Sequence, residues 1–266
     1  MAEARLGWRH ALLSGGIALI SRGLMARDAL LGVAKRMPKA ASREEIFLRS
    51  GGRRLAAVWV AAGAGAPAVL LCHGIGETVE HWSAVQAYLL EHGVSSLVFN
   101  YSGYGRSEGR ICTENCEEDL TAAYGEMLRR VSLDTRVYVL GFSLGSGIAA
   151  NGIAALVPAP AGLFLCEAFT SMREAARAGG APGWMVREIP DIWDTVRAME
   201  TVRVPVCVVH SDGDGLFPVR MARSIAAACG EQGELIVVHG LGHNEPYLKP
   251  ADAYWGPIVE RMLRAR

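Results

Sequence analysis

A serine between two glycines is the first feature of this sequence that suggests chemistry. Residues 141–145 read G-F-S-L-G, directly after the apolar run V-Y-V-L and directly before a stretch of small residues. A strand, a sharp turn and a closely packed helix in this order form a nucleophile elbow, which holds a serine hydroxyl above the edge of a sheet. We therefore predict that Ser143 is a catalytic nucleophile.

A serine hydroxyl is a weak nucleophile at neutral pH and needs a general base. The last apolar run, residues 235–238, leads into H-G-L-G-H-N at 239–244. His243 lies beyond the run on a loop whose glycines can bring it to the serine, so we predict it as the base. His239, at the end of the run, is the alternative.

The base needs a carboxylate that holds the imidazole tautomer and stabilises its charged form. The apolar run 205–210 is followed by S-D-G-D-G-L-F-P. We predict Asp214, which lies deeper in this loop, as the acid. The alternative is Asp212, which could instead cap the turn.

Acyl transfer also needs two backbone N–H groups that bind the developing oxyanion. One prediction is the N–H of Leu144, directly after the nucleophile. The other is the N–H of Ile75, in the loop H-G-I-G-E that follows the apolar run 68–72. Gly74 in this loop lets the backbone approach a substrate closely, so we predict that it contributes to substrate binding.

These motifs need elements that bring distant segments together. Short apolar runs alternate with helix-like stretches from residue 46 onward, which predicts an α/β fold with a mainly parallel central sheet covered by helices on both faces. The sequence S-G-G-R at 50–53 indicates a hairpin, so the first two strands are expected to be antiparallel. The expected strands are 44–49, 54–61, 68–72, 95–101, 136–141, 162–168, 205–210 and 234–239, and the expected helices are 80–91, 115–130, 144–156, 218–229 and 247–264.

Residues 169–200 interrupt this alternation with several glycines, prolines and tryptophans. They predict a short irregular excursion in place of a large cap. Apolar residues in such a connection often line a pocket at the carboxyl edge of a sheet, and Trp184 is predicted to bind substrate on this ground. Ordinary cover over the sheet is the alternative.

The first 43 residues precede this pattern and are predicted to form a helical arm. Apolar residues return at near-helical intervals over residues 5–36, with Arg22, Arg27, Lys35 and Arg36 on the polar side. The apolar run 11–20 is too short to span a bilayer, and no convincing A-x-A cleavage site follows it. The arm either packs on the domain or on a partner, or lies on a membrane surface.

Composition limits the remaining functions. The 266 residues, 51% of them hydrophobic, suffice for one large domain at 44–266. The 27 basic residues balance the 27 acidic ones, so no basic excess points to nucleic acid. The six cysteines match neither a CxxC pair nor a zinc site, which favours reduced thiols and a cytoplasmic location, with membrane association through the arm as a further expectation. No metal and no cofactor are predicted.

Taken together, five motifs make residues 44–266 resemble the α/β-hydrolase fold superfamily: L-C-H-G-I-G, F-N-Y-S-G-Y-G-R-S-E-G, G-F-S-L-G-S-G, H-S-D-G-D-G-L-F-P and G-L-G-H-N. The segment E-A-F-T-S-M-R at 167–173 is similar to that of capless Bem46-like serine hydrolases. The resemblance implies a Ser143–Asp214–His243 triad, and Ile75 and Leu144 as oxyanion donors. One departure is Cys166-Glu167, where an apolar or small residue is expected; Glu167 is predicted to lie near the pocket and bias its charge preference.

The function predicted from these features is a cofactor-free serine hydrolase that cleaves carboxylic esters or thioesters through an acyl-enzyme, acting on a small or lipid-like acyl substrate. A peptidase, an amidase, a perhydrolase or a C–C bond hydrolase would use the same triad. A non-catalytic binding module on the same fold is the remaining alternative. The loop at 101–109 is interpreted as architectural, with substrate contact by Tyr104 or Arg106 as the alternative.

Overall fold

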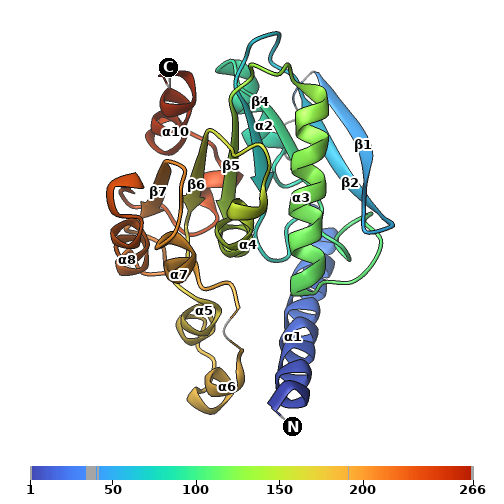
Figure 1. Ribbon diagram of the computed structural model, residues 1–266, viewed down its shortest axis with the longest axis vertical. Helices are drawn as coiled ribbons and strands as arrows, with labels where there is room; N and C mark the ends of the chain where they lie inside the picture. The colour runs from blue at the N-terminus through green and yellow to red at the C-terminus, as the bar shows by residue number, and fades with distance from the viewer. Residues whose placement is uncertain (1, 34–39, 41, 191, 265–266) are drawn as a thin grey trace.

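An eight-stranded sheet forms the centre of the computed structural model, which describes residues 2–33, 40, 42–190 and 192–264 (Figure 1). The strand order is β1-β2-β4-β3-β5-β6-β7-β8, and the strands from β4 to β8 in this order run parallel. The predicted fold class is confirmed. The strands are β1 Arg43–Ser50, β2 Arg53–Val60, β3 Ala68–Cys72, β4 Ser95–Phe99, β5 Val137–Phe142, β6 Gly162–Cys166, β7 Val206–Ser211 and β8 Gly233–Val238.

The first two strands form the expected antiparallel hairpin. Ser50 pairs with Arg53, so Gly51 and Gly52 alone make the turn. Their φ angles of 48° and 82° lie in the left-handed region, which glycine adopts without steric penalty and which two-residue hairpins require. The strand β2 is also antiparallel to β4 and joins the hairpin to the parallel part of the sheet.

Helices cover both faces of the sheet, so most of its strands are buried on both sides. One buried cluster packs the sheet against α3, α4, α7 and α8, and a second packs it against α2, α9 and α10. The 144–156 stretch ends in a 3₁₀ turn, and the 247–264 stretch is two helices. The helices named here are α2 Ser83–Glu91, α3 Thr113–Arg130, α4 Leu144–Gly152, α7 Thr195–Met199, α8 Arg220–Ala228, α9 Glu245–Leu248 and α10 Asp252–Arg264.

The excursion after β6 consists of three short helices, of which α5 Met172–Ala178 and α6 Gly183–Glu188 extend from the end of the molecule that carries the amino terminus (Figure 1). Ser171 caps α5 through its hydroxyl, which accepts the N–H of Glu174. The third helix, α7, returns the chain to β7.

The predicted arm is the helix α1, Ala2–Leu31, whose second half packs on the domain. Ile17 and Ser21 are buried one turn apart, and the Ser21 hydroxyl lies 2.7 Å from that of Tyr104. Arg22 and Arg27 are exposed as expected, while Lys35 and Arg36 lie outside the described residues. Within the described ranges, no helix combines the length and apolar character needed to cross a membrane.

Candidate active site

Ser143 lies at the turn between β5 and α4 with backbone angles φ 51° and ψ −118°. This φ is unusual for a residue other than glycine, and such strain is common at functional sites. The flanking glycines make the turn sterically feasible: a Cβ on Gly141 would lie 2.3 Å from the Gly145 carbonyl oxygen, and one on Gly145 would lie 2.0 Å from that of Cys72. The turn therefore requires glycine on both sides of the serine.

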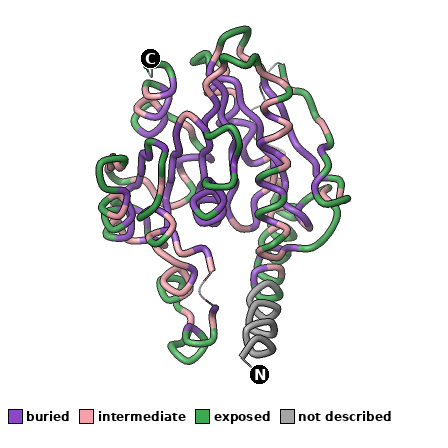
Figure 2. Tube along the Cα trace, in the orientation of Figure 1, coloured by how far each residue is buried: buried purple, intermediate pink, exposed green. Residues whose placement is uncertain are grey.

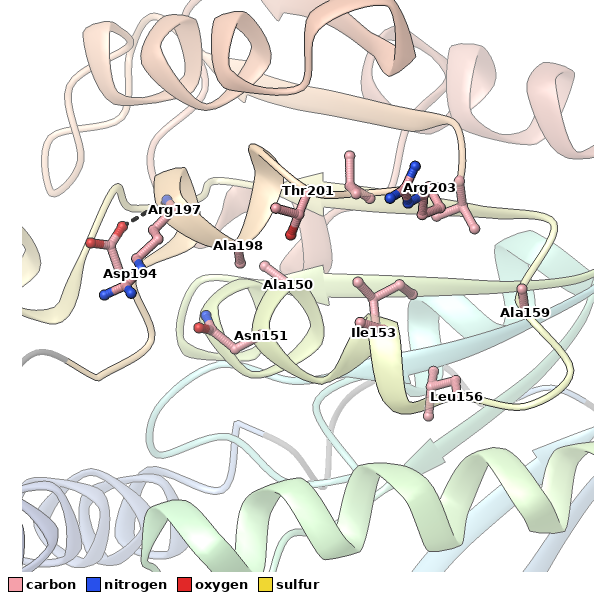
Figure 3. A pocket seen from close by; sticks show the side chains of 13 residues that line it. Ala150, Asn151, Ile153, Leu156, Ala159, Asp194, Arg197, Ala198, Thr201 and Arg203 are labelled. Carbon is pink, nitrogen blue, oxygen red and sulfur yellow. Dashed lines mark hydrogen bonds between the residues drawn. The ribbon is translucent and has the colours of Figure 1, made fainter.

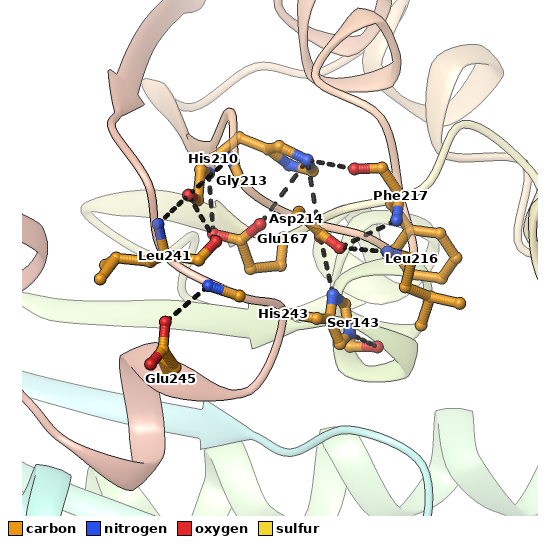
Figure 4. A network of polar contacts seen from close by, with 12 residues as sticks. Ser143, Glu167, His210, Gly213, Asp214, Leu216, Phe217, Leu241, His243 and Glu245 are labelled. Carbon is orange, nitrogen blue, oxygen red and sulfur yellow. Dashed lines mark hydrogen bonds and ion pairs between the residues drawn. The ribbon is translucent and has the colours of Figure 1, made fainter.

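The three predicted triad side chains meet at the carboxyl edge of the sheet (Figure 4). His243 Nε2 lies 3.0 Å from Ser143 Oγ, and His243 Nδ1 lies 2.7 Å from Asp214 Oδ2. Both distances are those of hydrogen bonds. The arrangement has the serine hydroxyl donate to Nε2 while Nδ1–H donates to the carboxylate, which is the geometry that a general base needs.

The loop after β7 holds Asp214 in its charged form. Burial disfavours that form, but hydrogen bonds from His243 and from backbone N–H groups outweigh it and lower the pKa of Asp214 to about 2. Asp214 Oδ1 accepts the N–H groups of Leu216 at 2.7 Å and Phe217 at 3.0 Å. Asp214 is therefore a fixed anion at neutral pH.

The two alternatives that the sequence offered, His239 and Asp212, pair with each other instead. His239 Nδ1 lies 2.6 Å from Asp212 Oδ2, and the N–H of Gly240 donates to the other oxygen of the same carboxylate. The side chain of His239 is 86% exposed. This second pair stabilises the loop on the surface and is separate from Ser143.

The two predicted oxyanion donors lie on neighbouring segments. Leu144 is the first residue of α4, so its N–H has no acceptor within the helix. The close approach of Gly145 to the carbonyls of Cys72 and His73 brings the loop with Ile75 beside the elbow. In the described part of the chain, neither N–H has a hydrogen-bond acceptor.

Sequence reasoning missed Glu77, which shapes the predicted oxyanion loop. Its carboxylate accepts the N–H of Gly74 and the indole N–H of Trp82, each at 2.8 Å. Burial raises the pKa of Glu77 to about 7, although both hydrogen bonds lower it. Gly74 therefore uses its N–H within the loop, and its contact with substrate stays a prediction. The signal in the sequence was a lone acidic residue at the end of H-G-I-G-E.

Glu167 requires a correction, because its side chain is fully buried and cannot contact a substrate from this position. Its backbone φ is 44°, and its carboxyl group lies beside Asp214, where Oε1 accepts the N–H of Ser211 at 3.0 Å (Figure 4). Burial raises the pKa of Glu167 to about 9, and the neighbouring Asp214 adds to this shift. The group is therefore a neutral acid at pH 7, and its buried Oε2 lies 3.6 Å from His210 Nε2.

His210 is a second buried group that the apolar pattern of β7 did not reveal. Its Nε2–H donates to the carbonyl of Phe217 at 2.8 Å and so closes the loop that carries Asp214. Burial lowers its pKa, which keeps the ring neutral. His210 thus stabilises the loop that carries Asp214, the predicted acid.

Trp184 is not brought to these residues. It lies on α6 and is 64% exposed, so its predicted role in substrate binding has no support from its position. The pocket of about 580 Å³ in Figure 3 is also remote: Ala150, Asn151 and Asp194 line it, at the opposite end of α4 from Ser143. A smaller cavity of about 240 Å³ adjoins the site, between α1, Ile75 and Asn244.

A metal is not favoured at this site. In the described residues, Glu167, Asp214 and His243 have donor atoms within 4.8 Å of one another. However, the Asp214 oxygens and His243 Nδ1 already bind each other or backbone N–H groups, and a protonated Glu167 is a poor metal ligand.

Comparisons with known proteins agree with this fold. The family model described as alpha/beta hydrolase fold matches residues 67–181. An uncharacterized protein of Mycobacterium tuberculosis is 28% identical over 90% of this chain and 87% of its own length. The lysophosphatidylserine lipase ABHD12 of Danio rerio is 28% identical over 60% of this chain, which spans about half (46%) of that lipase.

Solved structures show the same arrangement at low sequence identity. The esterase Pf2001 of Pyrococcus furiosus superposes with a TM-score of 0.68 at 17% identity, over 86% of this chain and 97% of its own. A bacterial membrane phospholipase A superposes with a TM-score of 0.66 at 15% identity, over 96% of each chain. The sheet order, the elbow and the family match on residues 67–181 together show that this chain has the α/β-hydrolase fold.

Proposed function

We propose that this hydrolase cleaves carboxylic esters or thioesters through an acyl-enzyme formed on Ser143. The observation that carries the proposal is the position of His243, which is within hydrogen-bond distance of both Ser143 Oγ and Asp214. A fold alone does not specify a reaction, whereas this geometry supports the roles of nucleophile, base and orienting acid for Ser143, His243 and Asp214.

In the first half-reaction, Ser143 Oγ attacks the acyl carbon while His243 Nε2 accepts the hydroxyl proton. The resulting imidazolium lies against the Asp214 carboxylate, which stabilises its charge. The N–H groups of Ile75 and Leu144 bind the oxyanion of the tetrahedral intermediate, and His243 returns the proton to the leaving alcohol or thiol.

In the second half-reaction, water attacks the acyl group on Ser143. His243 now accepts a proton from the water, so the same imidazole serves as acid and base in turn. Collapse of the second tetrahedral intermediate releases the carboxylic acid and restores the serine. The reaction uses no group other than the chain and water.

Turnover of p-nitrophenyl esters of increasing acyl length, by wild type and Ser143→Ala, tests this proposal. We expect saturable hydrolysis by wild type and a loss of at least about 10³-fold in Ser143→Ala with an unchanged thermal transition. Ser146→Ala is the matched control, because Ser146 is one turn along α4 and its hydroxyl donates to the Ser143 carbonyl. Equal turnover by wild type and Ser143→Ala would place the chemistry elsewhere.

The same assay separates the alternatives. Hydrolysis of the corresponding p-nitroanilides at comparable kcat/KM would favour an amidase or peptidase. No turnover of any ester, thioester or amide by folded wild type would favour a binding module.

A further inference from the structure

The exposed apolar residues of this protein are concentrated on two helices. Of eleven large apolar side chains that the described residues expose, seven lie on α1 and α6, although these helices form a small part of the chain. Scattered single apolar residues are normal on a protein surface, but a concentration of them marks an interaction site. The seven are Leu19, Ile20, Leu24, Leu30, Leu31, Trp184 and Met185.

Both helices lie at the same end of the molecule (Figure 1), where α6 and the described second half of α1 expose many of their residues (Figure 2). This end is the catalytic one: α5 and α6 follow the carboxyl end of β6, and Leu24 of α1 touches Gly76 in the predicted oxyanion loop. Leu24, Arg27 and Leu31 also line the small cavity beside Ile75 and Asn244. The exposed apolar residues of α1 therefore lie beside the loop that carries Ile75.

The excess of positive charge on this part of the chain favours an anionic partner. Residues 1–40 contain seven Lys or Arg and two Asp or Glu, whereas the whole chain is neutral. Arg22 and Arg27 are exposed on the same helix as the apolar residues, and Arg187 is exposed on α6. Apolar side chains accompanied by arginines match an anionic lipid surface, in which the former enter the acyl boundary and the latter face the headgroups.

Two contacts hold α1 against the domain. Ser21 contacts Tyr104, and His81 Nε2 lies 3.2 Å from the Asp28 carboxylate. These contacts, the first of which is buried, hold one side of α1 on the domain, and the other side faces outward. We infer that the surface formed by α1 and α6 binds the face of an anionic lipid bilayer, with α1 in the interface and the catalytic edge toward the lipid.

The test uses the full chain with Ser143→Ala, so that it does not depend on the proposed function. We expect this protein to co-sediment with vesicles of phosphatidylcholine and phosphatidylglycerol, and much less with phosphatidylcholine alone or at high salt. The double variant Leu19→Ser, Leu30→Ser and the single variant Trp184→Ser should each lower the vesicle partition coefficient about tenfold or more. Arg22→Gln with Arg27→Gln should remove most of the preference for the anionic vesicles.

The matched control is Leu133→Ser, because Leu133 is equally apolar and fully exposed but lies at the amino end of β5, away from α1 and α6. It should bind vesicles as the parent does. Absence of binding to the anionic vesicles, or an equal loss in Leu133→Ser, would overturn the inference. A dimer that dissociates on Leu19→Ser, Leu30→Ser, with no vesicle binding, would overturn it in favour of a second copy of the chain. Far-ultraviolet circular dichroism of each variant verifies the fold.

Discussion

Glu167→Gln should stabilise this protein increasingly as pH rises. The wild-type carboxyl has an ordinary pKa of 4.5 and a pKa of about 9 in the folded chain, because burial disfavours its ionised form. Between these two values the unfolded state binds fewer protons than the folded state, so wild-type stability falls as pH increases. Glutamine has nearly the same shape and does not titrate, and its carbonyl oxygen can accept the Ser211 N–H as Glu167 Oε1 does.

The size of this stabilisation follows from the difference between the two pKa values of Glu167. Each pH unit between about 4.5 and 9 corresponds to about 1.4 kcal/mol, so the difference in unfolding free energy between Glu167→Gln and wild type should grow by about 4 kcal/mol from pH 5 to pH 8. Urea unfolding of both proteins at the two pH values measures it, and subtraction cancels the other titrating groups. Glu200→Gln, on the surface after α7, should show no such growth. A difference that is the same at pH 5 and pH 8 would refute the neutral, buried state of Glu167.

Three further predictions follow from the packing. Gly145→Ala should destabilise the fold by several kcal/mol, because its Cβ would meet the Cys72 carbonyl at 2.0 Å, whereas Gly215→Ala, with open space around it, should change the thermal transition little. Asp214→Asn should lower turnover about 10⁴-fold. It should also remove about 2 kcal/mol of stability that wild type has above pH 3.8 and loses as pH falls toward 2, measured by acid unfolding. Asp119→Ala should lower the free energy of unfolding, measured in urea, by about 3–5 kcal/mol. The buried Asp119 carboxylate accepts hydrogen bonds from Ser50 Oγ at 2.6 Å, from the Ser102 N–H at 2.7 Å and from Arg53. Glu118 is an exposed partner of the same arginine, so Glu118→Ala should change this free energy by less than about 1 kcal/mol.

The sheet and the elbow could be predicted from the sequence because their signals are local. A strand end, a serine between glycines and a small-residue helix all lie within residues 137–150. The loops with His243 and Asp214 also follow apolar strands, so their place at one sheet edge follows from parallel topology. The loop glycines favoured His243 over His239, and the coordinates add that the His243 ring is the one that lies against Ser143.

The supporting residues could not be predicted in this way. Glu167 and His210 look like a departure from a motif and the end of an apolar run, and their roles depend on burial beside Asp214. The role of Glu77 likewise depends on Trp82, whose indole N–H donates to the Glu77 carboxylate in the folded chain. Such groups are recognised by their neighbours in space, and sequence spacing does not report those neighbours.

Helix α1 lies within the predicted arm, and α5 and α6 lie within the predicted excursion, but the sequence did not indicate how either segment relates to the site. Trp184 was expected at the pocket and lies on the outward surface of α6. The arm was expected either to pack on the domain or on a partner, or to lie on a membrane surface. The structure shows packing on the domain, with Ile17 and Ser21 buried. The second stays a proposal, supported by the apolar residues that α1 leaves exposed.

Covalent labelling of the folded protein by a fluorophosphonate tests the central claim most directly, because the probe reacts with a serine only where a base and oxyanion donors activate it. Intact mass spectrometry with peptide mapping should show one adduct, on Ser143, in wild type. The adduct should be absent from Ser143→Ala and form far more slowly in His243→Ala. An unlabelled wild type, or labelling that is unchanged in His243→Ala, would contradict an activated nucleophile at this position.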